Sequence, residues 1–151
     1  MQSTPTLSPS AAPGQQAVFR ARLSAIPDTA AFARAFCEDN GLGQDTAKRL
    51  ILVIEELFTN TIKHGYRDET DKPIRISLAL ADGRIDVLYE DWASRYDPLS
   101  RFSTGPADLD AELEARREGG LGVYLIGQLV ASARYAYEAG ANRLWLTLKR
   151  G

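Results

Sequence analysis

The sequence has little of the chemistry that builds disulfides or metal clusters. Cys37 is the one cysteine and His64 the one histidine among 151 residues. A lone cysteine cannot form an internal disulfide, and a structural zinc site needs about four cysteine or histidine ligands. The formal net charge is −2, so no excess of positive charge is available for nucleic acid or for an anionic membrane. We therefore expect a cytoplasmic protein that binds neither.

The beginning of the chain is poor in apolar residues. The first 16 residues contain mainly serine, proline, alanine and other small or polar residues, without the basic and apolar segments of a secretory signal. This composition is typical of a disordered tail. The remainder is long enough for one hydrophobic core and short for two. We expect a disordered tail over residues 1–16 and a single domain over residues 17–151.

Hydrophobic periodicity predicts both helices and strands. Apolar residues recur at helical spacing in three segments, which we expect to be helices: 27–43, 44–65 and 119–131. Apolar and polar residues alternate in further segments, which we expect to be strands: 18–23, a hairpin over 73–91 turning at Asp82–Gly83, 132–138 and 143–150. The order predicts an α+β fold, a two-layer sandwich of a mostly antiparallel sheet with helices on one face. Asp45 or Thr46 is the expected N-cap of the longest helix.

That longest helix carries an unexpected set of polar residues. In "LILVIEELFTNTIKHGY", residues 50–66, Glu56, Asn60 and His64 follow one another at steps of four, and Lys63 follows Asn60 by three. Such spacing places all four on one helix face. The other residues of the segment are mostly apolar, which favours a polar face that lines a cavity. The alternative is that Glu56 and Lys63 are ordinary solvated charges and His64 caps the helix end.

Two other segments show polar or glycine residues beside buried elements. Asp91 ends an apolar strand and begins a long loop, although an aspartate here is often only a turn former. Glycines at 119, 120 and 122 precede an apolar helix, whose free N–H groups favour a phosphate. Close helix packing explains these glycines equally well.

Together the three segments resemble a known family. "EELFTNTIKHGY", "EDWASRYDP" and "GGLGVYLI" occur in the order of the nucleotide-binding boxes of the GHKL ATPase superfamily. The short form with E-x-x-x-N-x-x-x-H-G-Y is similar to the RsbW-like anti-sigma-factor serine kinases, over about residues 17–150. The resemblance implies the GHKL ATP-binding fold, ATP and Mg²⁺ as cofactors, and a homodimer. It also implies two partners, a sigma factor that is sequestered and an anti-sigma antagonist whose serine is phosphorylated.

The resemblance assigns roles to the helix residues. It implies that Asn60 is a ligand of the Mg²⁺ on the ATP phosphates and that Glu56 is the general base for the serine hydroxyl. An amide oxygen suits Mg²⁺, and a carboxylate one turn away can accept a proton. Glu55 points about 100° away around the helix and is the weaker candidate. Lys63 and His64 are expected near the phosphates.

The remaining boxes complete the expected nucleotide site. Asp91 matches the aspartate that accepts a hydrogen bond from the adenine amino group, a donor that guanine lacks at that edge. The second glycine box contributes Gly120, Leu121 and Gly122. Residues 99–118, with a short polar helix at 109–118, match the lid over ATP, which we expect to be poorly ordered without nucleotide. Arg116 or Arg117 is expected to contact the phosphates from this lid.

One residue departs from the family pattern. The family has glycine at the position of Ala93, two residues after Asp91, whereas "YDP" at residues 96–98 keeps the family signature. Glycine allows positive φ and a close approach to the base, so we expect the Ala93 methyl to weaken ATP binding. Two alternatives to the kinase follow: a module that sequesters its partner with little kinase activity, and an ATPase-like remnant that regulates something other than sigma. The presence of Glu56 favours the kinase, because a pure binder needs no base.

Overall fold

The computed structural model describes residues 14–99 and 126–149. The main elements, in chain order, are β1 (Gln15–Arg20), α1 (Ile26–Asp39), α2 (Gln44–Asn60), β2 (Pro73–Ala81), β3 (Arg84–Asp91), β4 (Val130–Glu138) and β5 (Ala141–Leu148). A 3-10 turn, Leu23–Ala25, precedes α1, and a π-helical turn, Thr61–Gly65, continues α2.

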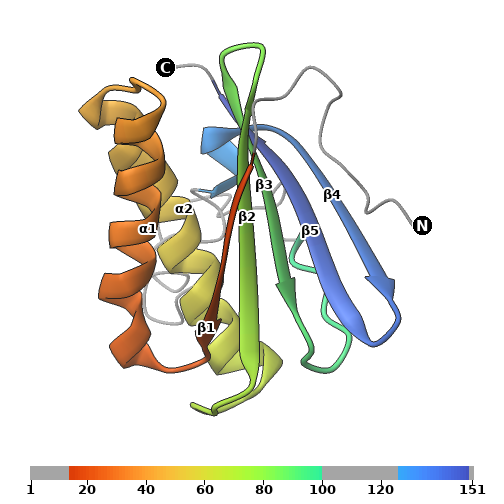
Figure 1. Ribbon diagram of the computed structural model, residues 1–151. Coiled ribbons are helices and arrows are strands. Elements are labelled where there is room, and N and C mark those ends of the chain that lie inside the picture. Colours follow the sequence, from red (N-terminus) through yellow and green to blue (C-terminus); the bar gives the residue numbers. More distant parts are fainter. Residues whose placement is uncertain (1–13, 100–125, 150–151) are drawn as a thin grey trace, which may run out of the picture.

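The five strands form one antiparallel sheet. Their order is β1-β2-β3-β5-β4, and each neighbouring pair is antiparallel. Helices α1 and α2 lie side by side against one face of this sheet (Figure 1). The α+β two-layer sandwich predicted from the sequence is therefore confirmed.

Both tight hairpins use backbone with positive φ. In the β2–β3 turn, Asp82 has φ 53° and Gly83 has φ 76°. In the β4–β5 turn, Ala139 has φ 52° and Gly140 has φ 78°. Two successive positive φ angles define the type I′ turn, whose twist matches that of a two-stranded ribbon. The Asp82–Gly83 hairpin was thus correctly predicted.

The core lies between the helices and the inner face of the sheet. Helix residues contribute its largest side chains, and alternate strand residues complete it. Fully buried members include Phe36, Leu50, Ile54, Phe58, Ile74, Ile76, Leu78, Ile85, Ile126 and Leu148. The end of α2 and the π turn that follows it contact the end of β3 through hydrogen bonds.

Some element boundaries differ from those predicted. Strand β1 covers Gln15–Arg20 instead of 18–23, so two residues assigned to the disordered tail pair with β2. Polar glutamines are tolerated there because β1 is an edge strand with one exposed side, and Ser77 donates a hydrogen bond to Gln16. The N-cap of α2 is Gly43, without a side-chain hydrogen bond, so the prediction of Asp45 or Thr46 was wrong.

The expected helix over 119–131 is only partly described. Residues 126–129 are helical, and β4 begins at Val130, so the helix ends before Ala131. The expected tail over 1–13 and the expected helix over 109–118 lie outside the described residues. No helix in the two described ranges has the length and apolar character needed to cross a lipid bilayer.

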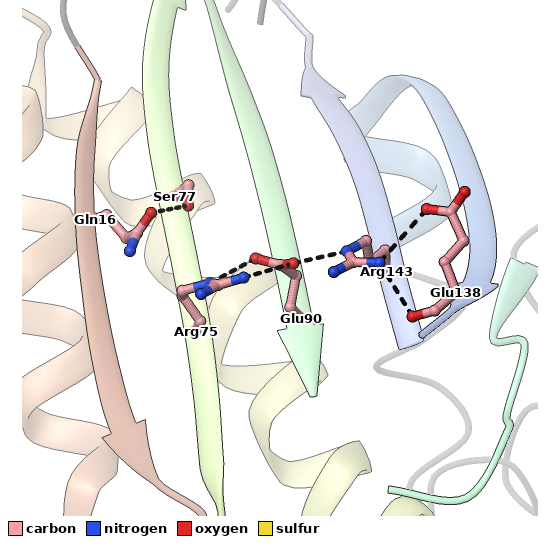
Figure 2. Close-up of polar contacts among 6 residues, drawn as sticks. All are labelled: Gln16, Arg75, Ser77, Glu90, Glu138 and Arg143. Atoms are coloured by element: carbon pink, nitrogen blue, oxygen red, sulfur yellow. Dashed lines mark hydrogen bonds and ion pairs between the residues drawn. The ribbon is translucent and has the colours of Figure 1, made fainter. Parts of the chain in front are cut away.

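The outer face of the sheet carries an ion-pair network. Glu90 accepts hydrogen bonds from Arg75 at 2.8 and 3.0 Å and from Arg143 at 2.8 Å, and Arg143 also reaches Glu138 (Figure 2). Burial raises the pKa of Glu90, but the two arginines outweigh burial and lower it. Successive strand residues point to opposite faces. Glu90 is thus held on the outer face while Asp91 points inward.

Candidate functional site

The end of α2 supplies the first side chains of the site. Glu56 is half-buried, and Asn60 is buried at the last residue of the helix. Lys63 and His64 are exposed. The four residues expected on one face are therefore divided into an enclosed pair and a solvent-facing pair.

Helix α2 then continues as a single π turn. Tyr66 N–H donates to the carbonyl of Thr61 at 2.8 Å, a bond that spans five residues instead of four. Such turns occur frequently at functional sites. Within this turn Thr61 and Gly65 are buried, and the Thr61 hydroxyl contacts Tyr89 and Asp91 of β3.

Asp91 is the charged group at the centre of the site. It is 7% exposed, on the inner face of β3. Its Oδ1 accepts hydrogen bonds from Ala93 N–H at 3.1 Å and from the Asn142 amide at 2.9 Å, and its Oδ2 accepts one from the Thr61 hydroxyl at 3.0 Å. Burial raises the pKa of Asp91, and the hydrogen bonds from Asn142, Ala93 and Thr61 oppose this rise without cancelling it.

Behind Asp91 lies a buried tyrosine. The Tyr89 hydroxyl is 2.7 Å from Thr61 Oγ1 and 3.1 Å from the carbonyl of Leu57. Since the single hydroxyl hydrogen of Thr61 serves Asp91, the Tyr89 hydrogen is shared between Thr61 and Leu57. Burial raises the pKa of Tyr89 well above its ordinary value, so Tyr89 remains a donor. The chain from Tyr89 through Thr61 therefore supports an ionised Asp91.

An open cavity joins these residues. Its empty space, including the mouth, is about 290 Å³. The walls combine apolar and polar side chains from α2, β3, β4, β5 and the segment after β3: Leu57, Asn60, Thr61, Tyr89, Asp91, Tyr96, Pro98, Tyr135, Asn142 and Leu144. Only about 20 Å³ of this space is enclosed, room for about one water molecule, so the residues line a small recess that is open to solvent. Asn60 and Asp91, both predicted from the sequence, line the same cavity.

The lining residues that sequence reasoning missed include Thr61, Tyr89 and Asn142. Asn142 had a detectable signal, because the other inner residues of β5 are the leucines Leu144, Leu146 and Leu148. A polar side chain at the same buried register needs partners. No comparable pattern marks Thr61 or Tyr89, whose roles depend on the packing of α2 against β3.

Glu56 lies outside the set of cavity-lining residues, one turn before Asn60. Burial and the nearby charge of Glu55 raise the pKa of Glu56, and the positive charge of Lys63 opposes this rise. A carboxyl group with a raised pKa is better matched to proton transfer near neutral pH. At the rim, the ring of His64 stacks against Tyr96, with 6.4 Å between the ring centroids.

Ala93 lies beside Gly65 at the edge of the site. It is 5% exposed. Its φ angle is not positive, so this position does not adopt the left-handed conformation that favours glycine. A Cβ built on Gly65 would lie 3.1 Å from the Ala93 Cβ, which places the Ala93 methyl against Gly65. Ala93 does not line the cavity. The backbone at Ala93 is therefore not in the strained left-handed region, and the expected effect of its methyl on ATP binding stays a prediction.

Several predicted site residues cannot be placed. The lid over 99–118 lies outside the described residues except for Leu99, as do Arg116, Arg117 and the glycine-box residues Gly120, Leu121 and Gly122. Their expected contacts with phosphate stay predictions.

The side chains available as metal ligands decide whether a metal ion would fit this site. Within the described ranges no cluster of three or more histidine, cysteine, aspartate or glutamate side chains is present. The Asn60 amide lines the cavity and has no hydrogen-bond partner among the residues that the structure describes. One neutral oxygen is too few to hold Mg²⁺ alone, but it suits an ion that arrives on phosphates and keeps several waters.

Comparison with known proteins identified a matching family and relatives of the chain. Residues 19–148 match the family described as the histidine kinase-like ATPase domain. A curated relative is the serine-protein kinase RsbW of Listeria monocytogenes, 28% identical over 138 residues, covering 91% of this chain and 82% of the relative.

Two solved structures are similar in fold. One contains the RsbU and RsbW domains of Rv1364c from Mycobacterium tuberculosis, with a TM-score of 0.58 and 22% identity over 93% of this chain. The present chain spans 34% of that protein. The other is the SiaB–SiaC complex from Pseudomonas aeruginosa, with a TM-score of 0.58 and 16% identity, covering 89% of this chain and 88% of the other.

Proposed function

Because this chain belongs to the histidine kinase-like ATPase domain family, we propose that it binds ATP with Mg²⁺ and phosphorylates a serine of a partner protein. The observation that carries the proposal is the cavity shared by Asn60 at the end of α2 and Asp91 at the end of β3. The Asn60 amide oxygen suits the Mg²⁺ on the phosphates of a nucleotide, and the Asp91 carboxylate suits the amino group of its base. Their meeting in one cavity supports a nucleotide site.

Asp91 recognises the base in this proposal. Two donors occupy Oδ1 and one occupies Oδ2, so the carboxylate keeps room for one further N–H donor. The adenine amino group is such a donor. The cavity walls Leu57 and Leu144 supply apolar contact for the faces of a ring.

Asn60 and Glu56 act at the phosphate end. When bound, Mg²⁺ neutralises phosphate charge during transfer, and the Asn60 amide oxygen is the protein group that would hold it. Glu56 accepts the proton of the attacking serine hydroxyl, and its raised pKa favours this role. Lys63 and His64 are expected nearer the phosphates, on the exposed side of the π turn.

The relatives suggest the biological setting. One is a serine-protein kinase, RsbW, and a structural neighbour is SiaB in complex with SiaC. We infer an anti-sigma regulatory factor of a partner-switching pathway, which sequesters a sigma factor and phosphorylates an anti-sigma antagonist. A homodimer in the cytoplasm is part of the same proposal.

Phosphoryl transfer provides the direct test. The purified protein is incubated with Mg²⁺ and γ-labelled ATP, together with candidate antagonist proteins and matched versions whose target serine is alanine. Labelled serine in the parent antagonist supports the kinase. ATP binding without transfer to any candidate supports the alternative, a partner-sequestering module with little or no kinase activity.

We expect Asn60→Ala to weaken Mg-ATP binding several-fold, because the metal on the phosphates loses its protein ligand. Titration calorimetry with Mg²⁺ and with EDTA measures the part of the affinity that depends on the metal. The matched control is Thr59→Ala, the preceding residue of α2, which does not line the cavity. Equal Mg-ATP affinities of Asn60→Ala and the parent would contradict the metal role.

We expect Ala93→Gly to change ATP affinity by less than about twofold, because the methyl packs against Gly65 and not into the cavity. The same substitution should lower the free energy of unfolding by about 1 kcal/mol, since glycine makes the unfolded chain more flexible. Calorimetric titration and urea denaturation measure the two effects. A marked increase in ATP affinity would show that the methyl obstructs the base after all.

A further inference from the structure

Asn142 makes more hydrogen-bonding contacts than a strand residue needs. It lies on β5 directly opposite Asp91 of β3 and is 7% exposed. Its side-chain nitrogen lies 2.9 Å from Asp91 Oδ1, 3.1 Å from the carbonyl of Ala93 and 3.1 Å from the carbonyl of Ser94. An amide nitrogen has two hydrogens. Three acceptors therefore use its whole donor capacity.

The side-chain oxygen of Asn142 is also fully used. It accepts hydrogen bonds from Tyr96 N–H at 3.0 Å and from the Tyr135 hydroxyl. Because a backbone N–H can only donate, the oxygen must face Tyr96 and the nitrogen must face Asp91. The amide orientation is thus determined by its partners. Although Asn142 lines the cavity, it has no donor or acceptor left for a ligand.

We propose that Asn142 is a positioning residue that holds Asp91 and the cavity wall in the geometry that receives the base. This inference rests on the proposed nucleotide-binding function. By occupying Oδ1 together with Ala93 N–H, Asn142 leaves Oδ2 as the oxygen that accepts from the ligand. Asn142 thereby contributes to the choice of a base with an amino group, without touching that base.

The same side chain also fixes the segment that follows β3. It contacts Ala93 and Ser94 through their carbonyls and Tyr96 through its N–H, so one residue of β5 bonds three backbone groups of this segment. Tyr96 and Pro98 of this segment form part of the cavity wall. Loss of Asn142 should therefore free the wall as well as the carboxylate.

The sharpest variant is Asn142→Asp, which has nearly the same shape but replaces the donating nitrogen by an oxygen. That oxygen meets the Asp91 carboxylate and two carbonyl groups, none of which can donate. We expect ATP affinity at about pH 8 to fall by about fivefold to tenfold. On lowering the pH to about 6 the deficit should shrink, because a proton shared by the two carboxyl groups restores one donor.

Groups that Asn142→Asp shares with the parent also contribute to the pH dependence of ATP affinity. Other titratable or charged groups face this pair or the residues bonded to it: Tyr89 on β3, Tyr66 after the π turn, Tyr135 on β4, and His64, Arg95, Tyr96 and Asp97 at the rim. All are present in the parent, whose affinity at each pH is the reference. Thr147→Val is the matched control, since Thr147 lies on β5 and bonds Asp86 instead of the site.

Amide hydrogen exchange tests the positioning role without any nucleotide. In Asn142→Ala, the Tyr96 N–H loses the acceptor that Asn142 provides, so we expect it to exchange at least about tenfold faster than in the parent or in Thr147→Val. Amides in the centre of β2 and β3 report whether the variant has kept its fold. Equal exchange at Tyr96 in folded Asn142→Ala would overturn the role of Asn142 in holding this segment.

The affinity measurements complete the test. If the parent binds ATP and Asn142→Asp binds it equally well, or more weakly by the same factor at both pH values, the positioning of Asp91 is refuted. If the parent does not bind ATP, the proposed function fails and the assignment of Asn142 to base selection fails with it, while the exchange at Tyr96 still decides its structural part. A deficit that shrinks at lower pH, with faster Tyr96 exchange, supports the inference.

Discussion

Glu56→Gln is expected to keep ATP binding and to lower phosphoryl transfer by about 10²-fold or more. The amide preserves the size of the side chain but cannot accept the proton of the serine hydroxyl. Glu56 does not line the cavity of Asp91 and Asn60, so the substitution leaves the nucleotide contacts in place. Single-turnover transfer to the antagonist, with ATP affinity measured separately, distinguishes a lost base from lost binding.

The pH profile adds a second signature of Glu56. Its pKa is raised above 4.5 by burial and by Glu55, and the ionised form is the base. Transfer by the parent should therefore fall as the pH falls through this raised pKa, and this decline should be absent in Glu56→Gln.

Glu55→Gln is the matched control for this prediction. It removes the neighbouring charge that raises the pKa of Glu56, so the decline should move to lower pH while transfer near neutral pH persists. Transfer by Glu56→Gln at the rate of the parent would remove the assignment of the base.

Much of the fold was predictable because local signals agreed with the tertiary structure. The helical spacing of α2 and the alternation in β2 and β3 are both long, and Asp82–Gly83 has the residue types that a type I′ turn demands. The first strand was misplaced because none of its residues is fully buried, so its hydrophobic pattern is weak. Gln15 and Gln16 belong to it only through pairing with β2, which no local pattern reveals.

Two residues of the candidate cavity were predictable from single elements. Spacing along α2 singled out Asn60, with Glu56 one turn before it and outside the cavity lining, and the end of β3 marked Asp91. Spacing could not separate the buried Asn60 from the exposed Lys63 and His64, because the π turn changes the helix geometry between them.

Asn142 lies 51 residues after Asp91 in the chain, and only the pairing of β5 with β3 brings the two together. The same limit applied to Ala93. Its departure from glycine was visible in the sequence, but its methyl is accommodated by Gly65, which is far away in the chain. Residues joined only by tertiary contacts carry no local signal, so neither relation could be predicted from spacing.

Gly65→Ala should have the second large effect, because its new methyl meets a neighbour that cannot move. The added Cβ would lie 3.1 Å from Ala93 Cβ and 3.4 Å from Thr61 Cγ2. Ala93 is held by Asp91 through its N–H and by Asn142 through its carbonyl. Thr61 is held by its hydrogen bond to Asp91. Relief of the clash must therefore displace groups bonded to Asp91.

Helix propensity acts in the opposite direction. Alanine in place of glycine stabilises compatible backbone by about 0.4–1 kcal/mol through the unfolded state, and Gly65 does not have positive φ. Overpacking of a buried contact costs about 1–3 kcal/mol. We expect the steric cost to prevail, with a lower free energy of unfolding and ATP affinity reduced by more than about tenfold.

The double variant Gly65→Ala with Ala93→Gly decides whether this contact is the cause. It moves the single methyl from one side of the contact to the other, so the clash is removed while the total volume is kept. Affinity and stability should return most of the way to those of the parent, giving a coupling energy of about 1 kcal/mol or more in a double-mutant cycle. Additive effects would instead show that Gly65 serves the π turn itself, and that Ala93 tolerates its neighbour independently.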